Sequence, residues 1–117
     1  MAYPRIAPYC ASRGGIVQLT KSLAAEWGPE GVTVNVLAPG WFKTEQTRAL
    51  WENDQWLSMM RTRIPAARIG IPEELGPLVV YLASDASAYI NGALIMIDGG
   101  FTTGGAKDII PTKTKKE

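Results

Sequence analysis

The feature that most restricts the fold is an apolar run of strand length, ALIMI at residues 93–97, which lies between an Asn91-Gly92 turn signal and Asp98-Gly99-Gly100. A strand that is apolar on both faces is typical of a parallel sheet covered by helices. A second strand candidate, 32–37, is rich in valine and is closed by Pro39-Gly40. Because helical patterns precede and separate the two runs, they predict an α/β fold with a parallel sheet.

Two segments have the periodicity of amphipathic helices. From Tyr9, apolar side chains recur at steps of three and four residues until Gly28-Pro29 ends the pattern: Ile16, Leu19, Leu23 and Trp27, with Val17, Thr20 and Ala24 widening the same face. Pro72-Glu73-Glu74 predicts the start of a second helix ending near Ser84-Asp85, because proline is tolerated in a first turn and acids favour its positive end. The segment 44–64 combines bulky and charged residues without clean periodicity, which indicates one or two short helices.

Composition argues against several classes of function. The net charge is +1, which argues against a nucleic acid or an anionic membrane as partner. No apolar run reaches the ~18–20 residues of a membrane helix. Cys10 is the only cysteine and histidine is absent, so a zinc site, a Ser-His-Asp triad and a Cys-His pair are excluded within the chain. We expect a cytoplasmic protein without a metal, with a flexible polar tail at 105–117.

Tyr9 and Arg13 are the first candidate catalytic pair. They are four residues apart at the head of a predicted helix, so their side chains lie on one face. A cation beside a phenol stabilises the phenolate, which makes tyrosine a usable general acid or base. The same spacing also fits ordinary packing and solvation, which is the commoner reason for such a pair.

Pro39, Gly40 and Thr44 are candidate binding residues because they directly follow a predicted strand. In open α/β sheets, ligands bind at the carboxyl ends of strands, where loops open a crevice. A glycine there lets the backbone approach a flat ring, and a threonine hydroxyl can donate to a phosphate or an amide. The alternative is an ordinary strand-to-helix turn, and Asp98-Gly99-Gly100 also fits a tight turn.

Six short motifs occur in order along the chain: YCASRGG at 9–15, VNVLAPG at 34–40, RIGIPEE at 68–74, LASD at 82–85, NG at 91–92 and DGG at 98–100. Together they resemble the carboxy-terminal half of the short-chain dehydrogenase/reductases, over about residues 3–104. The resemblance implies a partial Rossmann-type doubly wound parallel sheet at 1–104, with a substrate lid at 44–64. The stretch 39–47 is similar to gluconate 5-dehydrogenases, in the sugar-acid and polyol branch.

The resemblance implies a role for each candidate residue. Tyr9 matches the catalytic tyrosine, which exchanges a proton with the substrate oxygen as hydride moves to or from a nicotinamide. Arg13 falls where the family has a lysine that contacts the nicotinamide ribose and assists the tyrosine, so both residues would also touch the cofactor. Pro39, Gly40 and Thr44 fall in the loop that lines this cofactor, NAD or NADP. The substrate would be a small alcohol or ketone, and the full-length enzyme a homo-oligomer, either a dimer or a tetramer.

Two departures from the family pattern affect these expectations. Arg13 keeps the positive charge of a lysine, but its planar fork is wider, so the ribose contact would change geometry. No G-x-G-x-x-G arrangement occurs in the sequence, and the family's separate catalytic serine and asparagine belong to an amino-terminal half without a counterpart in it. We therefore expect a partial chain of an oxidoreductase, with exposed apolar faces and negligible turnover on its own.

Two other functions stay open. A 3-oxoacyl carrier-protein reductase shares the same motifs. A non-catalytic remnant would instead assemble with itself or with a full-length relative, through the helix that contains Gly14-Gly15 and through the apolar last strand.

Overall fold

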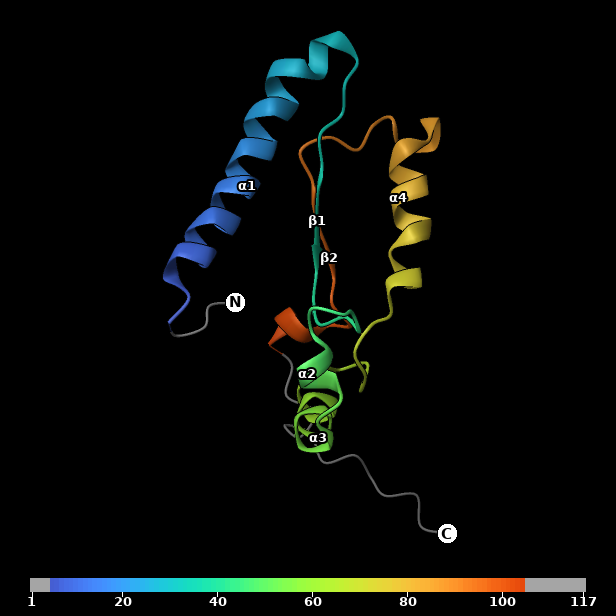
Figure 1. Cartoon of the computed structure of the whole chain (residues 1–117). Coiled ribbons are helices and arrows are strands. Elements are labelled where there is room, and N and C mark those ends of the chain that lie inside the picture. Colours follow the sequence, from blue (N-terminus) through green and yellow to red (C-terminus); the bar gives the residue numbers. More distant parts are fainter. Residues whose placement is uncertain (1–4, 105–117) are drawn as a thin grey trace. The chain divides into compact units, whose positions relative to one another are not determined.

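The computed structural model describes residues 5–104, so the predicted tail at 105–117 lies outside the described residues. The chain divides into two compact units (Figure 1). The first, here called the sheet unit, comprises residues 1–39 and 72–97. The second, the insert unit, comprises residues 40–71 and 98–117. Each unit is built from two stretches that are far apart in the sequence.

The sheet unit contains α1 (Ala7–Trp27), β1 (Val36–Pro39), α4 (Gly76–Ala83) and β2 (Leu94–Ile97). The two strands pair in parallel, in a register that runs from Val36 opposite Leu94 to Pro39 opposite Ile97. Figure 1 shows α1 and α4 on opposite sides of the strands. The predicted α/β architecture with a parallel sheet is therefore confirmed.

Strand β1 is shorter and later than the predicted run at 32–37. Before Val36, among the described residues, only one backbone bond joins the segments that precede β1 and β2, from the Gly92 amide to the Val34 carbonyl at 2.8 Å, and side-chain amides make the other bonds. The Val34 amide donates to Asn91 Oδ1 at 2.9 Å, and Asn35 bonds in both directions, from Nδ2 to the Ile90 carbonyl at 2.9 Å and from the Ala93 amide to Oδ1 at 3.0 Å. Regular pairing begins only where these bonds end.

Only part of the predicted face of α1 is buried. Three stripe residues are largely exposed, Ile16 at 39%, Leu19 at 56% and Trp27 at 42%, whereas Thr20 and Ala24 are buried. Asn91 Nδ2 donates to the Ala24 carbonyl at 2.9 Å and fixes this part of the helix to the turn before β2. The predicted face is therefore buried at its small members, Thr20 and Ala24, and largely exposed at these three bulky ones.

Helix α4 begins later than predicted. Residues 72–74 form a 3-10 turn, and the α-helix starts at Gly76, with Pro77 in its first turn where the missing N–H costs nothing. Bulky apolar side chains on this helix and on β2 are exposed: Val79, Val80, Tyr81, Leu94 and Met96. The expectation of exposed apolar faces is confirmed.

The insert unit contains two short helices, α2 (Arg48–Trp51) and α3 (Asp54–Arg63), as the sequence predicted for 44–64. The Asn53 side chain caps α3 by accepting from the Trp56 amide at 2.9 Å. Phe42, Met60 and Ile64 form the buried core of this unit. Within residues 5–104, no helix is both long and apolar enough to cross a bilayer.

Candidate functional site

Tyr9 and Arg13 are in contact on the first turns of α1. The Arg13 Cζ atom lies 4.8 Å from the centroid of the Tyr9 ring, which places the guanidinium over the aromatic face. Tyr9 is 56% exposed, so solutes can reach it. The Ser12 hydroxyl donates to the Tyr9 carbonyl at 2.8 Å, a hydrogen bond within the first turns of the helix. The juxtaposition expected from the four-residue spacing is therefore present.

Gly40 is required by the packing of the insert unit. A Cβ added at Gly40 would lie 2.6 Å from the Asp98 Cβ and 2.8 Å from its Cα, so the backbone passes too close for any side chain. The sequence suggested that this glycine admits a ligand ring. In the structure Asp98 packs against Gly40, and contact between this glycine and a ligand ring stays a prediction.

Asp98 fixes the turn that faces Gly40. Its Oδ2 accepts from the Thr102 hydroxyl at 2.6 Å and from the Thr102 amide at 2.9 Å, while Oδ1 accepts from the Gly100 amide at 2.9 Å. The Thr102 hydroxyl, with the help of these amides, holds the pKa of Asp98 below its usual range, against a smaller opposing effect of burial. The tight-turn interpretation of residues 98–100 is confirmed.

Thr44 lies at the head of a hydrogen-bonded loop. Its amide donates to Thr47 Oγ1 at 3.1 Å, its hydroxyl is 3.1 Å from the same atom, and Thr47 Oγ1 donates to the Phe42 carbonyl at 2.7 Å. The Thr44 carbonyl accepts from Trp51 Nε1 at 2.8 Å. Thr44 itself is exposed. Sequence reasoning missed Thr47 and Trp51, which hold this loop in shape.

The candidate residues are divided between the units. Tyr9, Arg13 and Pro39 belong to the sheet unit, with Pro39 as the last residue of β1, whereas Gly40 and Thr44 belong to the insert unit. The structure brings Tyr9 to Arg13. A single crevice that contains all five residues stays a prediction.

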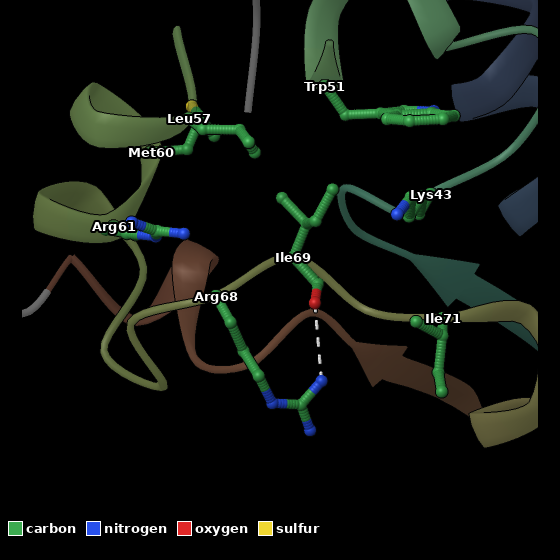
Figure 2. Close-up of a pocket in the computed structure, with 8 residues that line it drawn as sticks. All are labelled: Lys43, Trp51, Leu57, Met60, Arg61, Arg68, Ile69 and Ile71. Carbon is green, nitrogen blue, oxygen red and sulfur yellow. Dashed lines mark hydrogen bonds between the residues drawn. The ribbon is translucent and has the colours of Figure 1, made fainter. Parts of the chain in front are cut away.

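A pocket of about 200 Å³ lies within the insert unit (Figure 2). Its apolar walls come from Trp51, Leu57, Met60, Ile69 and Ile71. Its charged lining is cationic: Lys43, Arg61 and Arg68. Figure 2 shows Arg61 and Lys43 on either side of Ile69, whereas the Arg68 side chain extends away from Trp51. Bulky and charged residues in 44–64 were the only sequence signal for this pocket.

Comparison with known proteins decides the family. A family model described as enoyl-(acyl carrier protein) reductase matches residues 1–102. The gluconate 5-dehydrogenase of Gluconobacter oxydans (strain 621H) is 44% identical over 102 residues, which cover 87% of this chain and 40% of that relative. The chain belongs to the short-chain dehydrogenase/reductase family.

Solved structures agree with this membership. A gluconate 5-dehydrogenase from Burkholderia cenocepacia J2315, in complex with NADP and tartrate, is 41% identical with a TM-score of 0.84 and covers 90% of this chain and 41% of that one. A 4-hydroxyisoleucine dehydrogenase complexed with NADH is 35% identical with a TM-score of 0.86, over 90% of this chain and 43% of that one. This short-chain dehydrogenase/reductase chain spans less than half the length of these relatives. The resemblance predicted from the six motifs is confirmed.

Proposed function

We propose that this chain carries the proton-transfer part of an NAD(P)-dependent oxidoreductase, which interconverts a secondary alcohol and a ketone on a sugar acid, a polyol or a similar small molecule. The observation that carries the proposal is the cation held against an exposed phenol, Arg13 Cζ at 4.8 Å from the Tyr9 ring centroid. Likeness to gluconate 5-dehydrogenases supports the substrate class.

In the proposed mechanism, Tyr9 is the general acid or base. Its phenolate takes the hydroxyl proton of the alcohol during oxidation and becomes the phenol, and the phenol gives its proton to the ketone oxygen during reduction. The Arg13 charge stabilises the negative charge that develops on the phenol when its proton leaves. A bound nicotinamide supplies the hydride acceptor or donor. Pro39, Gly40 and Thr44 would hold it.

The donors in this chain fit only part of that cofactor. The exposed Thr44 hydroxyl and the Arg13 guanidinium can serve an amide, a ribose or a phosphate oxygen. No G-x-G-x-x-G turn is present in the sequence to hold a pyrophosphate at a helix terminus. We therefore expect negligible turnover of NADH or NADPH by the 117 residues alone, since the cofactor would be poorly positioned. Ordinary steady-state turnover by this chain would contradict that expectation.

The role of Tyr9 is testable in a fusion of this chain behind the amino-terminal region of the Gluconobacter gluconate 5-dehydrogenase. We expect oxidation of D-gluconate with NAD or NADP, and a loss of roughly 10²–10⁴-fold in turnover on Tyr9→Phe, because the proton-transfer group is removed. Tyr89→Phe is the matched control, since Tyr89 is fully exposed and lies outside the site. If the Tyr9→Phe fusion is as active as the parent, Tyr9 is not the proton-transfer residue.

A 3-oxoacyl carrier-protein reductase is a second candidate, supported by the matching family model, whose description names an enoyl-(acyl carrier protein) reductase and so shares the carrier-protein thioester but not the group reduced. The same fusion separates the two. Reduction of a 3-oxoacyl thioester with higher kcat/KM than oxidation of gluconate would favour this second function.

We also propose a cytoplasmic homo-oligomer for the whole enzyme, a dimer or a tetramer. The exposed Val80 and Met96 side chains support burial against another polypeptide. Analytical ultracentrifugation of the fusion protein measures its oligomeric state. A monomer with a sharp melting transition would contradict oligomerisation, including that of a non-catalytic remnant.

A further inference from the structure

We propose that Thr47 is a positioning residue for Thr44, and that it decides which hydrogen bond Thr44 offers to a ligand. Thr47 holds the Thr44 hydroxyl with its proton turned into the loop, so the exposed side of that oxygen can only accept. Thr44 then recognises an N–H donor rather than a phosphate oxygen. This inference rests on the proposed oxidoreductase function and deepens it.

The Thr47 hydroxyl makes every hydrogen bond of which it is capable, because a hydroxyl has one proton and two lone pairs. Its oxygen lies 2.7 Å from the Phe42 carbonyl oxygen, 3.1 Å from the Thr44 amide nitrogen and 3.1 Å from the Thr44 hydroxyl oxygen. The carbonyl can only accept and the amide can only donate. The third contact, between the two hydroxyls, is the one whose direction is to be decided.

The proton of Thr47 belongs to the Phe42 carbonyl. Two oxygens 2.7 Å apart are at hydrogen-bond distance and repel each other unless a proton lies between them. Phe42 is buried, so its carbonyl needs a donor from within the chain. The Thr44 carbonyl is farther from Thr47, at 3.3 Å, and already accepts from Trp51 Nε1 at 2.8 Å. Thr47 therefore has no proton to give to the Thr44 hydroxyl.

The Thr44 hydroxyl is then the donor in its bond with Thr47. Its proton points to the lone pair of Thr47 Oγ1 that the Thr44 amide leaves open. Since Thr44 is exposed, a ligand can approach its oxygen but meets only lone pairs there. A pyrophosphate oxygen also only accepts, so it gains no bond from this hydroxyl, whereas an amine or amide N–H does.

The orientation of the Thr47 side chain supports this role. Thr47 is the N-cap residue of α2, a position where threonine commonly accepts from an amide of the first helical turn. Its side chain makes no such bond and instead turns back to the loop at Phe42 and Thr44. The hydroxyl thus serves the loop before the helix and not the helix itself.

A nicotinamide group carries the donor that this arrangement fits. Its carboxamide has an NH2 group, while the pyrophosphate of the same cofactor offers acceptors only. The Thr44 oxygen is thereby assigned to the carboxamide amine, with Thr47 behind it, and is excluded as a ligand of the phosphates.

The test measures equilibrium binding in the fusion described above, which carries all 117 residues. Tryptophan fluorescence gives the Kd of the oxidised dinucleotide and of its 3-acetylpyridine analogue, in which a methyl group replaces the NH2. We expect the parent fusion to bind the carboxamide form roughly tenfold more tightly, since one hydrogen bond distinguishes the two probes.

Thr47→Val removes the hydroxyl at similar volume and should bring the ratio of the two Kd values to about 1. The Thr44 hydroxyl is then free to donate to the acetyl oxygen as readily as it accepts from the amine. Thr47→Ser keeps the hydroxyl and should keep the ratio. Thr33→Val, the same substitution at an exposed threonine of the sheet unit, should leave it unchanged. A merely structural role of Thr47 would raise both Kd values together without changing their ratio.

A second measurement needs no substitution and covers the case in which Thr47→Val disturbs the loop. Loss of the Trp51 indole N–H signal in NMR spectra would reveal such a disturbance, because Trp51 Nε1 donates to the Thr44 carbonyl. Hydroxyl-proton NMR of the unmodified 117-residue chain should show a Thr44 proton that exchanges slowly with water and lies close to Thr47. A rapidly exchanging Thr44 proton would overturn the proposal, as would equal Kd values in the parent or an unchanged ratio in a folded Thr47→Val fusion.

Failure of this inference is separable from failure of the proposed function, because neither measurement depends on turnover. An inactive fusion that keeps the carboxamide preference would reject only the oxidoreductase role. An active fusion without that preference would reject only the role of Thr47. If the fusion binds neither dinucleotide, the proposed function fails, and the hydroxyl measurement still decides where the Thr44 proton points.

Discussion

Replacing Gly40 with alanine should destabilise the insert unit, because the new methyl group would occupy space that Asp98 fills. An ideal Cβ would lie 2.6 Å from the Asp98 Cβ and 2.8 Å from its Cα, well inside van der Waals contact. Asp98 cannot retreat easily, since Gly100 and Thr102 donate three hydrogen bonds to its carboxylate. One of the two backbones must therefore move.

The size of the effect follows from the atoms involved. Overpacking a filled site by one methyl group costs about 1–3 kcal/mol, and the upper part of this range applies when a backbone atom is struck. For a chain of about 100 residues, 1 kcal/mol shifts Tm by roughly 4 °C. We expect Gly40→Ala to melt about 8–12 °C below the parent chain.

Gly14→Ala is the matched control with the opposite sign. Among the described residues, nothing lies within 4 Å of a Cβ added at Gly14, and the position is inside α1. Alanine should stabilise the helix by about 1 kcal/mol, which raises Tm by roughly 4 °C. Thermal unfolding followed by far-UV circular dichroism measures both variants under one set of conditions.

The reasoning fails if Gly40→Ala melts at or above the parent temperature, because the close approach to Asp98 would then carry no energetic weight. A fall in Tm for Gly14→Ala would have a different interpretation. It would mean that another polypeptide packs against this face of α1, as the sequence suggested for Gly14-Gly15.

Asn35→Ala should lower the free energy of unfolding by about 1–3 kcal/mol, because the Ile90 carbonyl and the Ala93 amide lose their partner; urea unfolding measures it, and an unchanged midpoint would contradict it. Asp98→Asn should destabilise the chain at pH 7. The folded pKa of Asp98 is depressed, so its contribution is present above the unfolded value of about 3.9 and is lost as pH falls through the folded value. Melting curves of variant and parent should converge once the pH falls below the folded pKa of Asp98, and a constant difference over the whole range would argue against ionisation as the cause.

The sequence predicted the kind of each main element better than its limits. Apolar runs identified both strands and their parallel pairing, because a strand that is apolar on both faces is typical of a parallel sheet. The start of β1 was missed because it depends on Asn35 and Asn91, whose amides meet only after the chain has folded. Periodicity likewise identified α1 and a face that includes Thr20 and Ala24, but not that these small residues would be buried while Ile16, Leu19 and Trp27 stay exposed.

In the candidate site, too, local contacts could be predicted from the sequence and tertiary contacts could not. The contact between Tyr9 and Arg13 follows from helical geometry alone, so four-residue spacing was enough to predict it. The sequence indicated a lid at 44–64 but not the lining of the pocket, because Lys43 and Ile69 come together only through the tertiary pairing of Phe42 with Gly70. Residue spacing along a helix predicts contacts between near neighbours, whereas contacts between distant segments depend on the tertiary fold.

The amide groups of Asn35 and Asn91 fasten the carboxyl end of α1 and both strand entrances without any ionisable atom. Acidification that strips carboxylates of charge, or salt that screens ion pairs, leaves such a fastening untouched. The hydrogen bonds that join helix α1, which carries Tyr9, to the strands are therefore expected to persist when pH or salt concentration changes. Solutes that solvate amide groups directly, such as urea, are expected to separate the helix from the strands.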